Sequence, residues 1–139
     1  MDYRKFGNKI IARIDRGEEI VASLKAICQS EGVKLASVSA IGAVNNFTVG
    51  VFSPKDKTYK ANKFAGDYEI VSLLGTVTTK DGQFYAHLHM SAGDGEGKVF
   101  GGHLNEAFVS ATCEMVIDIA DGAVGRVYSE EIGLNLFEF

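Results

Sequence analysis

The chain has 139 residues, of which 46% are hydrophobic and 23% charged, and it carries one proline and a formal net charge of −4. This composition excludes a disordered protein, and no apolar run approaches the roughly 20 residues that a membrane-spanning helix needs. Because the length suits one domain and the first residues lack the apolar core of a signal peptide, we predict a single domain over residues 1–139 that is cytoplasmic and binds no membrane.

The first part of the chain predicts one strand followed by the only strong helix. Residues 3–14 have the apolar weight of a strand. Asp15 and Glu18 have the spacing of a helix-capping box, and the following apolar residues recur at the spacing of a core-facing helix that runs to about Glu31. Gly32 then stands at the expected C-terminal stop.

Beyond this helix the chain predicts only strands, with turns at 53–57, 65–67 and 80–83 that carry glycine, proline or aspartate. The strand 68–79 is the most apolar and is expected at the centre of its sheet. The expected strands are 35–52, broken near Gly42, then 58–64, 68–79, 84–92, 106–120, 123–128 and 133–139. Many strands with one helix predict an α+β fold, in which the helix packs on a strongly bent, antiparallel-rich sheet that the last two strands complete.

The cysteines and the charges favour an ordinary intracellular domain. Cys28 and Cys113 lie in apolar stretches and are predicted to be small buried side chains in a reducing compartment. Basic residues gather at 4–16 and at 55–63, and we interpret both clusters as solvated strand faces. A negative net charge and the lack of a recognisable DNA-binding motif do not favour binding to a phosphate backbone.

All three histidines of the chain lie between Tyr85 and Leu104. His87 and His89 are two residues apart in a predicted strand, so their side chains leave the same face of the sheet. His103 follows two glycines that let the backbone approach its neighbours closely. Three neutral imidazoles with one open position are a zinc-site pattern, so we predict a metal site; the alternative from the residues alone is a set of ordinary polar histidines.

A fourth metal ligand could be water or a carboxylate from Glu69, Asp94 or Glu114. Glu69 and Glu114 have apolar neighbours that predict burial, and a buried carboxylate needs a partner. For Glu114 we favour a salt bridge to an arginine such as Arg13 or Arg126. For Glu69 the metal and the salt bridge remain open alternatives.

The motif H-L-H, followed by G-D-G-E-G-K-V-F-G-G-H-L, resembles the signature of the plant and prokaryote conserved domain, the PPC domain. The likeness covers nearly the whole chain and includes Arg13–Ile20, Ala40–Val44, Tyr68–Gly75 and Thr112–Ile117. The resemblance implies a mixed α/β domain that assembles as a homotrimer. Free-standing prokaryotic members are commonly labelled DNA-binding, whereas in plants a short basic hook beside the domain contacts DNA, and this sequence has no such hook.

The histidine pattern is also similar to that of acetolactate decarboxylase, a zinc enzyme of related fold. This likeness implies zinc at His87, His89 and His103. That enzyme also places an arginine and carboxylates around its metal, but no arginine here can be aligned to that role, so no catalytic residue is assigned. Three functions stay open: a DNA-associated or regulatory module, a small zinc-dependent ester hydrolase or decarboxylase, and a structural trimer that senses a small molecule.

Overall fold

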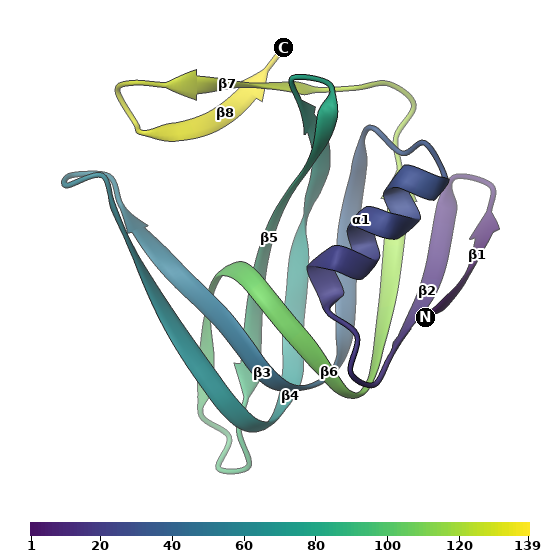
Figure 1. The fold of residues 1–139 in the computed structure, drawn as a ribbon, viewed down its shortest axis with the longest axis vertical. Helices are drawn as coiled ribbons and strands as arrows, with labels where there is room; N and C mark the ends of the chain where they lie inside the picture. Colours follow the sequence, from purple (N-terminus) through teal and green to yellow (C-terminus); the bar gives the residue numbers. More distant parts are fainter.

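The computed structural model describes residues 1–139 and shows one helix with a mainly antiparallel, strongly curled sheet, as predicted (Figure 1). The elements in chain order are β1 (Asp2–Phe6), β2 (Lys9–Asp15), α1 (Ile20–Ser30), β3 (Ala36–Ser53), β4 (Thr58–Lys80), β5 (Gln83–Gly93), β6 (Val99–Ile119), β7 (Gly125–Ser129) and β8 (Leu134–Glu138). No helix of the structure is long and apolar enough to span a membrane.

Six strands form the main sheet in the order β1-β2-β6-β3-β4-β5, and all neighbours are antiparallel. The first part of β6 also pairs with β5, so that β3, β4, β5 and β6 form a closed ring of pairings. At His103 the strand β6 has β3 on one side and β5 on the other. The curl therefore brings β5 and β6 together at the histidines.

The three longest strands bend at bulges instead of ending. Strand β4 has 23 residues and includes 65–67, where a turn was predicted; that prediction was wrong. The register between β3 and β4 shifts there, between Val44 and Asn46, and Gly66 has φ +132°. A second bulge lies at Gly42, where an added Cβ would be 2.3 Å from a backbone oxygen of β6, so only glycine allows the close approach.

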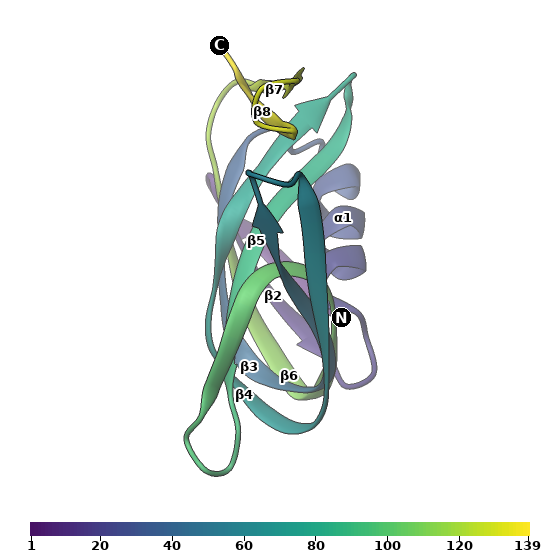
Figure 2. The same cartoon turned by 90° about the vertical axis from the view of Figure 1, so that its left-hand side faces the viewer.

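Helix α1 covers only one side of the sheet (Figure 2). The predicted capping box does not start the helix: the Asp15 N–H donates to the Glu18 carboxylate at 2.7 Å, as in such a box, but Asp15 is still paired within the sheet and the first helical residue is Ile20. The helix begins after Glu19, whose carboxylate accepts the N–H groups of Val21 and Ala22 and that of Ala107 in β6. It ends as predicted, with Gly32 at φ +65°.

The core lies between α1 and the sheet face that it covers. It is built from alternate strand residues, including Ile10, Ile14, Leu73 and Ile117, each at most 1% exposed. The cysteines belong to this core, as predicted, and burial raises the pKa of each thiol to about 12, so both are unreactive. Strand β4 lies inside the sheet as expected. Its face away from α1 is open to solvent, as the 58% exposure of Leu74 shows.

Two further strand predictions need correction. Residues 3–14 form two strands that reverse at Gly7, where φ is +60°, instead of one strand. The last two strands do not complete the main sheet but pair only with each other, as a hairpin. The hairpin lies across one end of the main sheet (Figure 1), and the Thr79 N–H donates to the Val124 carbonyl at 3.2 Å where the chain enters it. The predicted turn at 80–83 is confirmed, with positive φ at Asp81 and Gly82.

Candidate metal centre

The three histidines converge on the sheet face that α1 does not cover. His87 and His89 alternate along β5 with Leu88 and Met90, which are each 2% exposed and point into the core. His103 lies in β6 directly opposite His89. The possible ligand atoms of the three imidazoles all lie within 4.8 Å of one another. A tetrahedral ion about 2.0–2.1 Å from each nitrogen needs separations of about 3.3–3.4 Å, which small ring rotations supply, so these residues fit a metal ion.

Close backbone packing explains why glycines precede His103. A Cβ at Gly102 would be 2.5 Å from the Gly50 oxygen in β3, and one at Gly101 would be 2.8 Å from the Met90 oxygen in β5. Contacts this short leave no room for any side chain. The glycine pair therefore lets β6 fit between β3 and β5, which places the His103 ring 5.7 Å from that of His89.

The surroundings keep two of the imidazoles neutral. His87 retains part of its surface open to solvent, yet desolvation by the protein lowers its pKa, and the nearby His103, His89 and Arg126 lower it further. Burial also lowers the pKa of His103, with a smaller contribution from His89. Because a metal binds the neutral imidazole, both shifts favour metal binding near neutral pH.

None of the carboxylates proposed as a fourth ligand joins the cluster, which contains histidines alone. Glu69 and Glu114 are exposed, so the prediction that they are buried was wrong. Asp94 instead closes the loop between β5 and β6, where its side chain accepts the backbone N–H groups of Glu96 and Lys98, each at 2.9 Å. The salt bridge expected for Glu114 is also not formed.

Neither of the two arginines considered as partners of Glu114 forms a salt bridge with it. Arg13 stands opposite Glu114 in the register of β2 and β6, but it pairs with Asp15 at 2.7 Å. The other candidate, Arg126, forms no ion pair with any carboxylate of the chain. Neither arginine pairs with Glu114, and no carboxylate belongs to the histidine cluster.

A family model described as the Plants and Prokaryotes Conserved (PCC) domain matches residues 1–121. The chain belongs to this family. The same domain is written PPC in a related solved structure, and we use that form here. The resemblance inferred from the sequence motifs is thus confirmed, while no curated protein matches the chain.

Solved structures agree closely with this PPC fold. A protein from Bacteroides thetaiotaomicron, described as a "putative dna binding protein", is 34% identical, with 99% of this chain and 96% of that chain covered and a TM-score of 0.97. A metal-containing protein from Archaeoglobus fulgidus is 31% identical over 100% of this chain and 99% of its own, with a TM-score of 0.88. A PPC protein from Pyrococcus horikoshii is 34% identical, with 99% of this chain and 95% of that chain covered and a TM-score of 0.87.

An arginine of this chain lies beside the cluster, and the sequence did not predict it there. Arg126 of β7 is 8% exposed, and its Nη2 donates to the Thr76 hydroxyl at 3.5 Å. Thr76 lies directly opposite His87 in the register of β4 and β5. The only available signal was that Arg126 is the one arginine after residue 16. Nothing in the sequence indicates that the C-terminal hairpin folds back towards β5.

Tyr59 of β4 contacts both the ring and the backbone of His103. Its ring meets the His103 ring edge-on at 6.0 Å, and its hydroxyl donates to Asn105 at 2.6 Å and to the His103 carbonyl at 3.3 Å. Burial raises the pKa of Tyr59, so its hydroxyl keeps its proton near neutral pH. Tyr59 is therefore a positioning residue for His103.

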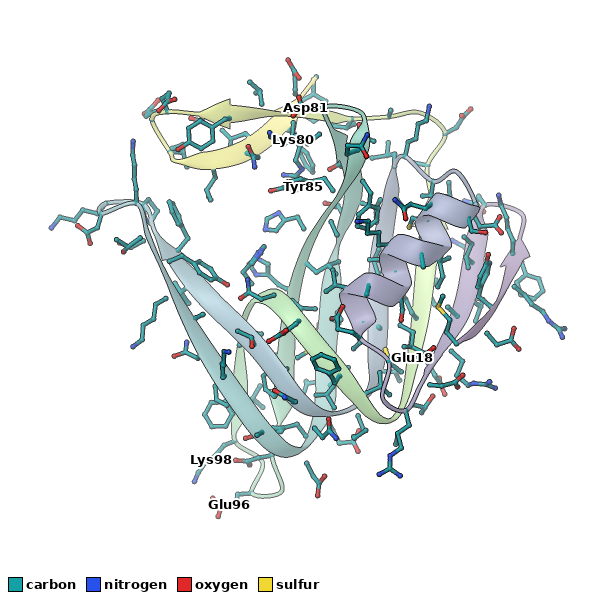
Figure 3. All side chains as sticks on the ribbon, viewed as in Figure 1. Glu18, Lys80, Asp81, Tyr85, Glu96 and Lys98 are labelled. Carbon is teal, nitrogen blue, oxygen red and sulfur yellow. The ribbon has the colours of Figure 1, made fainter.

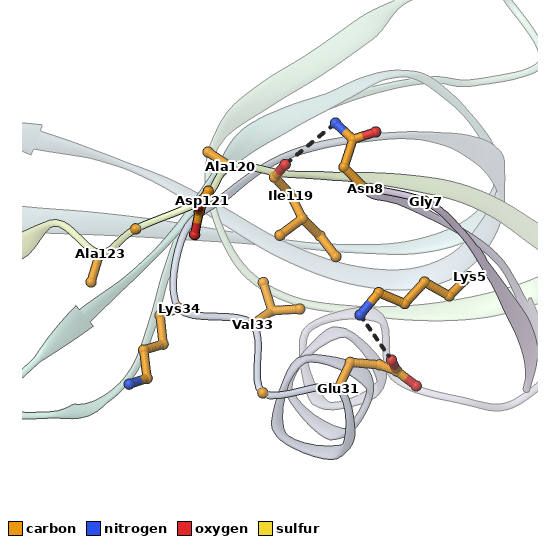
Figure 4. A pocket seen from close by; sticks show the side chains of 12 residues that line it. Lys5, Gly7, Asn8, Glu31, Val33, Lys34, Ile119, Ala120, Asp121 and Ala123 are labelled. Carbon is orange, nitrogen blue, oxygen red and sulfur yellow. Dashed lines mark hydrogen bonds and ion pairs between the residues drawn. The ribbon is translucent and has the colours of Figure 1, made fainter.

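A broad surface depression lies elsewhere, where the end of α1 approaches the turn between β1 and β2 (Figure 4). The ion pair of Lys5 and Glu31, at 3.4 Å, crosses it. No histidine or cysteine lines this depression. Of the surface features of the domain, the histidine cluster is therefore the one equipped for metal chemistry.

Proposed function

We propose that this PPC domain is a zinc-binding protein in which His87, His89 and His103 hold one ion and leave a coordination position open to a small molecule. The observation that carries the proposal is the approach of their ligand atoms to within 4.8 Å, with no carboxylate or thiol in the group. Structural zinc sites are usually closed by four protein ligands, whereas three histidines and one open position are typical of sites that bind exogenous ligands. The relative described as metal-containing supports the same assignment.

The chain's own residues prepare this site for binding. The lowered pKa values of His87 and His103 favour the neutral form of both rings, and Tyr59 binds the backbone carbonyl of His103 and meets its ring edge-on. When bound, zinc supplies Lewis-acid chemistry, because it polarises carbonyl groups and acidifies water. With no acidic group in the cluster we assign no general base. Ligand binding is therefore the better supported role, and ester hydrolysis or decarboxylation is the enzymatic alternative.

We further propose that the protein assembles as a homotrimer through the sheet face opposite α1. Large apolar side chains on that face are between 45% and 59% exposed, namely Ile11, Ile41, Val71 and Leu74. These four also line a shallow apolar groove. A contiguous apolar surface of this kind favours burial against another copy.

Elemental analysis of untagged protein, with the oligomeric mass determined by light scattering on the same sample, tests this proposal. We expect about one zinc per chain in a trimer, because one three-histidine site binds one ion. His103→Ala should lose stoichiometric zinc, while Gln83→Ala, an exposed change in β5 that removes no histidine, should keep it. Absence of metal from the wild-type protein after zinc is added would overturn the proposal.

A second candidate function is DNA binding. It is favoured by four lysines, Lys55, Lys57, Lys60 and Lys63, on the hairpin of β3 and β4 that projects from the domain (Figure 1), and by the description of the Bacteroides relative. Against it stands the net charge of −4. Fluorescence anisotropy with duplex DNA at several salt concentrations decides: binding that weakens with salt and with Lys60→Ala supports it, and no binding at low salt rejects it.

A further inference from the structure

Arg126 is a buried cation without a counter-charge. It is 8% exposed, yet none of the ion pairs of the chain includes it. Its partners are all neutral: the hydroxyls of Thr78 at 2.9 Å and Thr76 at 3.5 Å, and the Asn135 carbonyl at 3.0 Å. Arginine is rarely buried unless it is paired, because desolvation of an uncompensated charge is costly. Such a group is suited to an anion supplied from outside the chain.

The guanidinium is held so that one end approaches the histidine cluster. Its Nε donates to Thr78, which lies opposite Tyr85, and its Nη2 donates to Thr76, which lies opposite His87. Cross-strand pairs of this kind present their side chains on the same face. The Nη2 end of Arg126 therefore lies at the edge of the proposed metal site.

Two aromatic rings leave only the edge of the guanidinium available for further bonds. Its central carbon lies 4.6 Å from the centre of the Tyr85 ring and 4.5 Å from that of Phe137. Figure 3 shows Tyr85 below the hairpin of β7 and β8, which supplies Phe137. A guanidinium has five N–H groups, and three are engaged by the hydrogen bonds described above. The two that remain lie in the plane between the rings.

We propose that Arg126 and the three-histidine site together bind a small carboxylate-bearing molecule, with its carboxylate on the free edge of Arg126 and a neighbouring oxygen at the open position of the metal. The inference rests on the proposed zinc site and adds the class of ligand. A flat carboxylate matches the planar fork of a guanidinium with two parallel hydrogen bonds. The two rings favour this flat group over a tetrahedral phosphate.

The carboxylate half of this site comes from the C-terminal hairpin. Arg126, Asn135 and Phe137 all follow residue 121, where the match to the family model ends. The histidines, in contrast, lie within the matched residues. The structure thus joins a ligand-recognition element from the C-terminal segment to the metal-ligand set of the PPC domain.

Protein loaded with cobalt in place of zinc tests the inference, since the visible spectrum of cobalt reports a change of its ligands without any assay of activity. We titrate glycolate, its neutral counterpart glycolamide, inorganic phosphate, and imidazole, which is neutral and needs only an open metal position. In the wild-type protein we expect glycolate to bind at least about 10-fold more tightly than glycolamide, because hydrogen bonds to charged groups are the stronger kind.

The variant Arg126→Gln should weaken glycolate binding by about 10-fold to 100-fold and leave glycolamide and imidazole unchanged. Arg16→Gln, at an exposed arginine, serves as the matched control and should change nothing. Where Arg126→Gln fails to fold, as judged by circular dichroism, Arg126→Lys takes its place: it keeps the charge without the planar fork and should also weaken glycolate binding while leaving imidazole unchanged.

Three outcomes would overturn the inference: equal affinity for glycolate and glycolamide, unchanged glycolate binding in folded Arg126→Gln, and phosphate binding more tightly than glycolate. In the last case the ligand class is a phosphate and not a carboxylate. The imidazole titration separates this inference from the proposal on which it rests. If imidazole alters the cobalt spectrum but Arg126→Gln leaves glycolate binding unchanged, only the inference fails. If neither imidazole nor any anion alters the spectrum, the proposal of an open metal site fails as well.

Discussion

The two faces of the main sheet differ in whether the rest of the chain covers them. Leu73 and Leu74 are neighbours in β4, yet Leu73 faces α1 and is 1% exposed, while Leu74 faces away and is 58% exposed. The covered face holds the core, and the open face holds the histidines and the apolar patch. We infer that the covered face determines the stability of the domain, and that the open face is free for ligands and other copies.

The leucine pair gives the largest expected effect. Leu73→Ala removes fully buried side-chain volume and should lower the free energy of unfolding by about 2–5 kcal/mol, whatever the protein concentration. Leu74→Ala should act chiefly on the proposed assembly, and shift a trimer towards monomer on dilution. Urea denaturation and sedimentation velocity check the two effects. Equal losses of stability in both variants, with unchanged assembly, would remove the distinction between the faces.

A smaller effect is expected where the helix is fastened to the covered face. Glu19 caps α1 and also accepts the Ala107 N–H of β6 at 3.0 Å, so Glu19→Ala should lower the free energy of unfolding by about 1–2 kcal/mol. Urea denaturation measures this change. Glu96→Ala, in an exposed loop where the carboxylate meets only Lys98, is the control and should cost less than about 0.5 kcal/mol. A similar cost for both glutamates would contradict the capping role.

The histidines should contribute less still to folding. The triple variant His87→Ala, His89→Ala, His103→Ala removes side chains from the open face, so without metal its free energy of unfolding should lie within about 1 kcal/mol of that of metal-free wild-type protein. Thermal denaturation in the presence of a chelator provides the measurement. Added zinc should then raise the melting temperature of the wild-type protein alone. An unfolded triple variant would show that the histidines belong to the core.

The smallest effect is a dependence on pH in the absence of metal. His87 and His103 have pKa values lowered below the ordinary 6.5, so as pH falls through 6.5 the unfolded chain takes up protons before the folded protein does. Stability should therefore decrease from about pH 7.5 to about pH 5.5. Urea denaturation across this range should show a shallower slope for His87→Gln, His103→Gln than for the wild-type protein. A steeper slope in that variant would reverse the sign of the argument.

The sequence predicts local features well and sheet partners poorly. Gly32 and the Asp81-Gly82 turn were predicted correctly because each depends only on the backbone conformation of a few adjacent residues. Ala65-Gly66-Asp67 has the composition of a turn, but a partner strand continues opposite it and makes it a bulge. The capping-box error has the same origin, because the pairing of Asp15 with Thr112 cannot be read from nearby residues.

The candidate metal site shows the same difference between local features and long-range contacts. His87, His89 and His103 were predicted together because strand alternation and the glycine pair are local signals. Glu114 was expected to be buried because its sequence neighbours are apolar, but it lies opposite Ile41 on the open face of the sheet. Arg126 was missed as a neighbour of the site because it belongs to a separate sheet and bonds Thr76, opposite His87, from there. Sequence patterns therefore predicted the three histidines that cluster in the structure, but not the arginine that lies near them.

All three proposed metal ligands lie within residues 87–103, on two strands joined by one short loop. During synthesis this set is complete once residue 103 leaves the ribosome, before residues 112–118 emerge to pair with β2. Hairpins form within about 1–10 μs, far faster than the chain is elongated. An ion bound at that stage would hold β5 against β6 while the domain is still open, and metal supply would then influence the rate of folding as well as the properties of the finished protein.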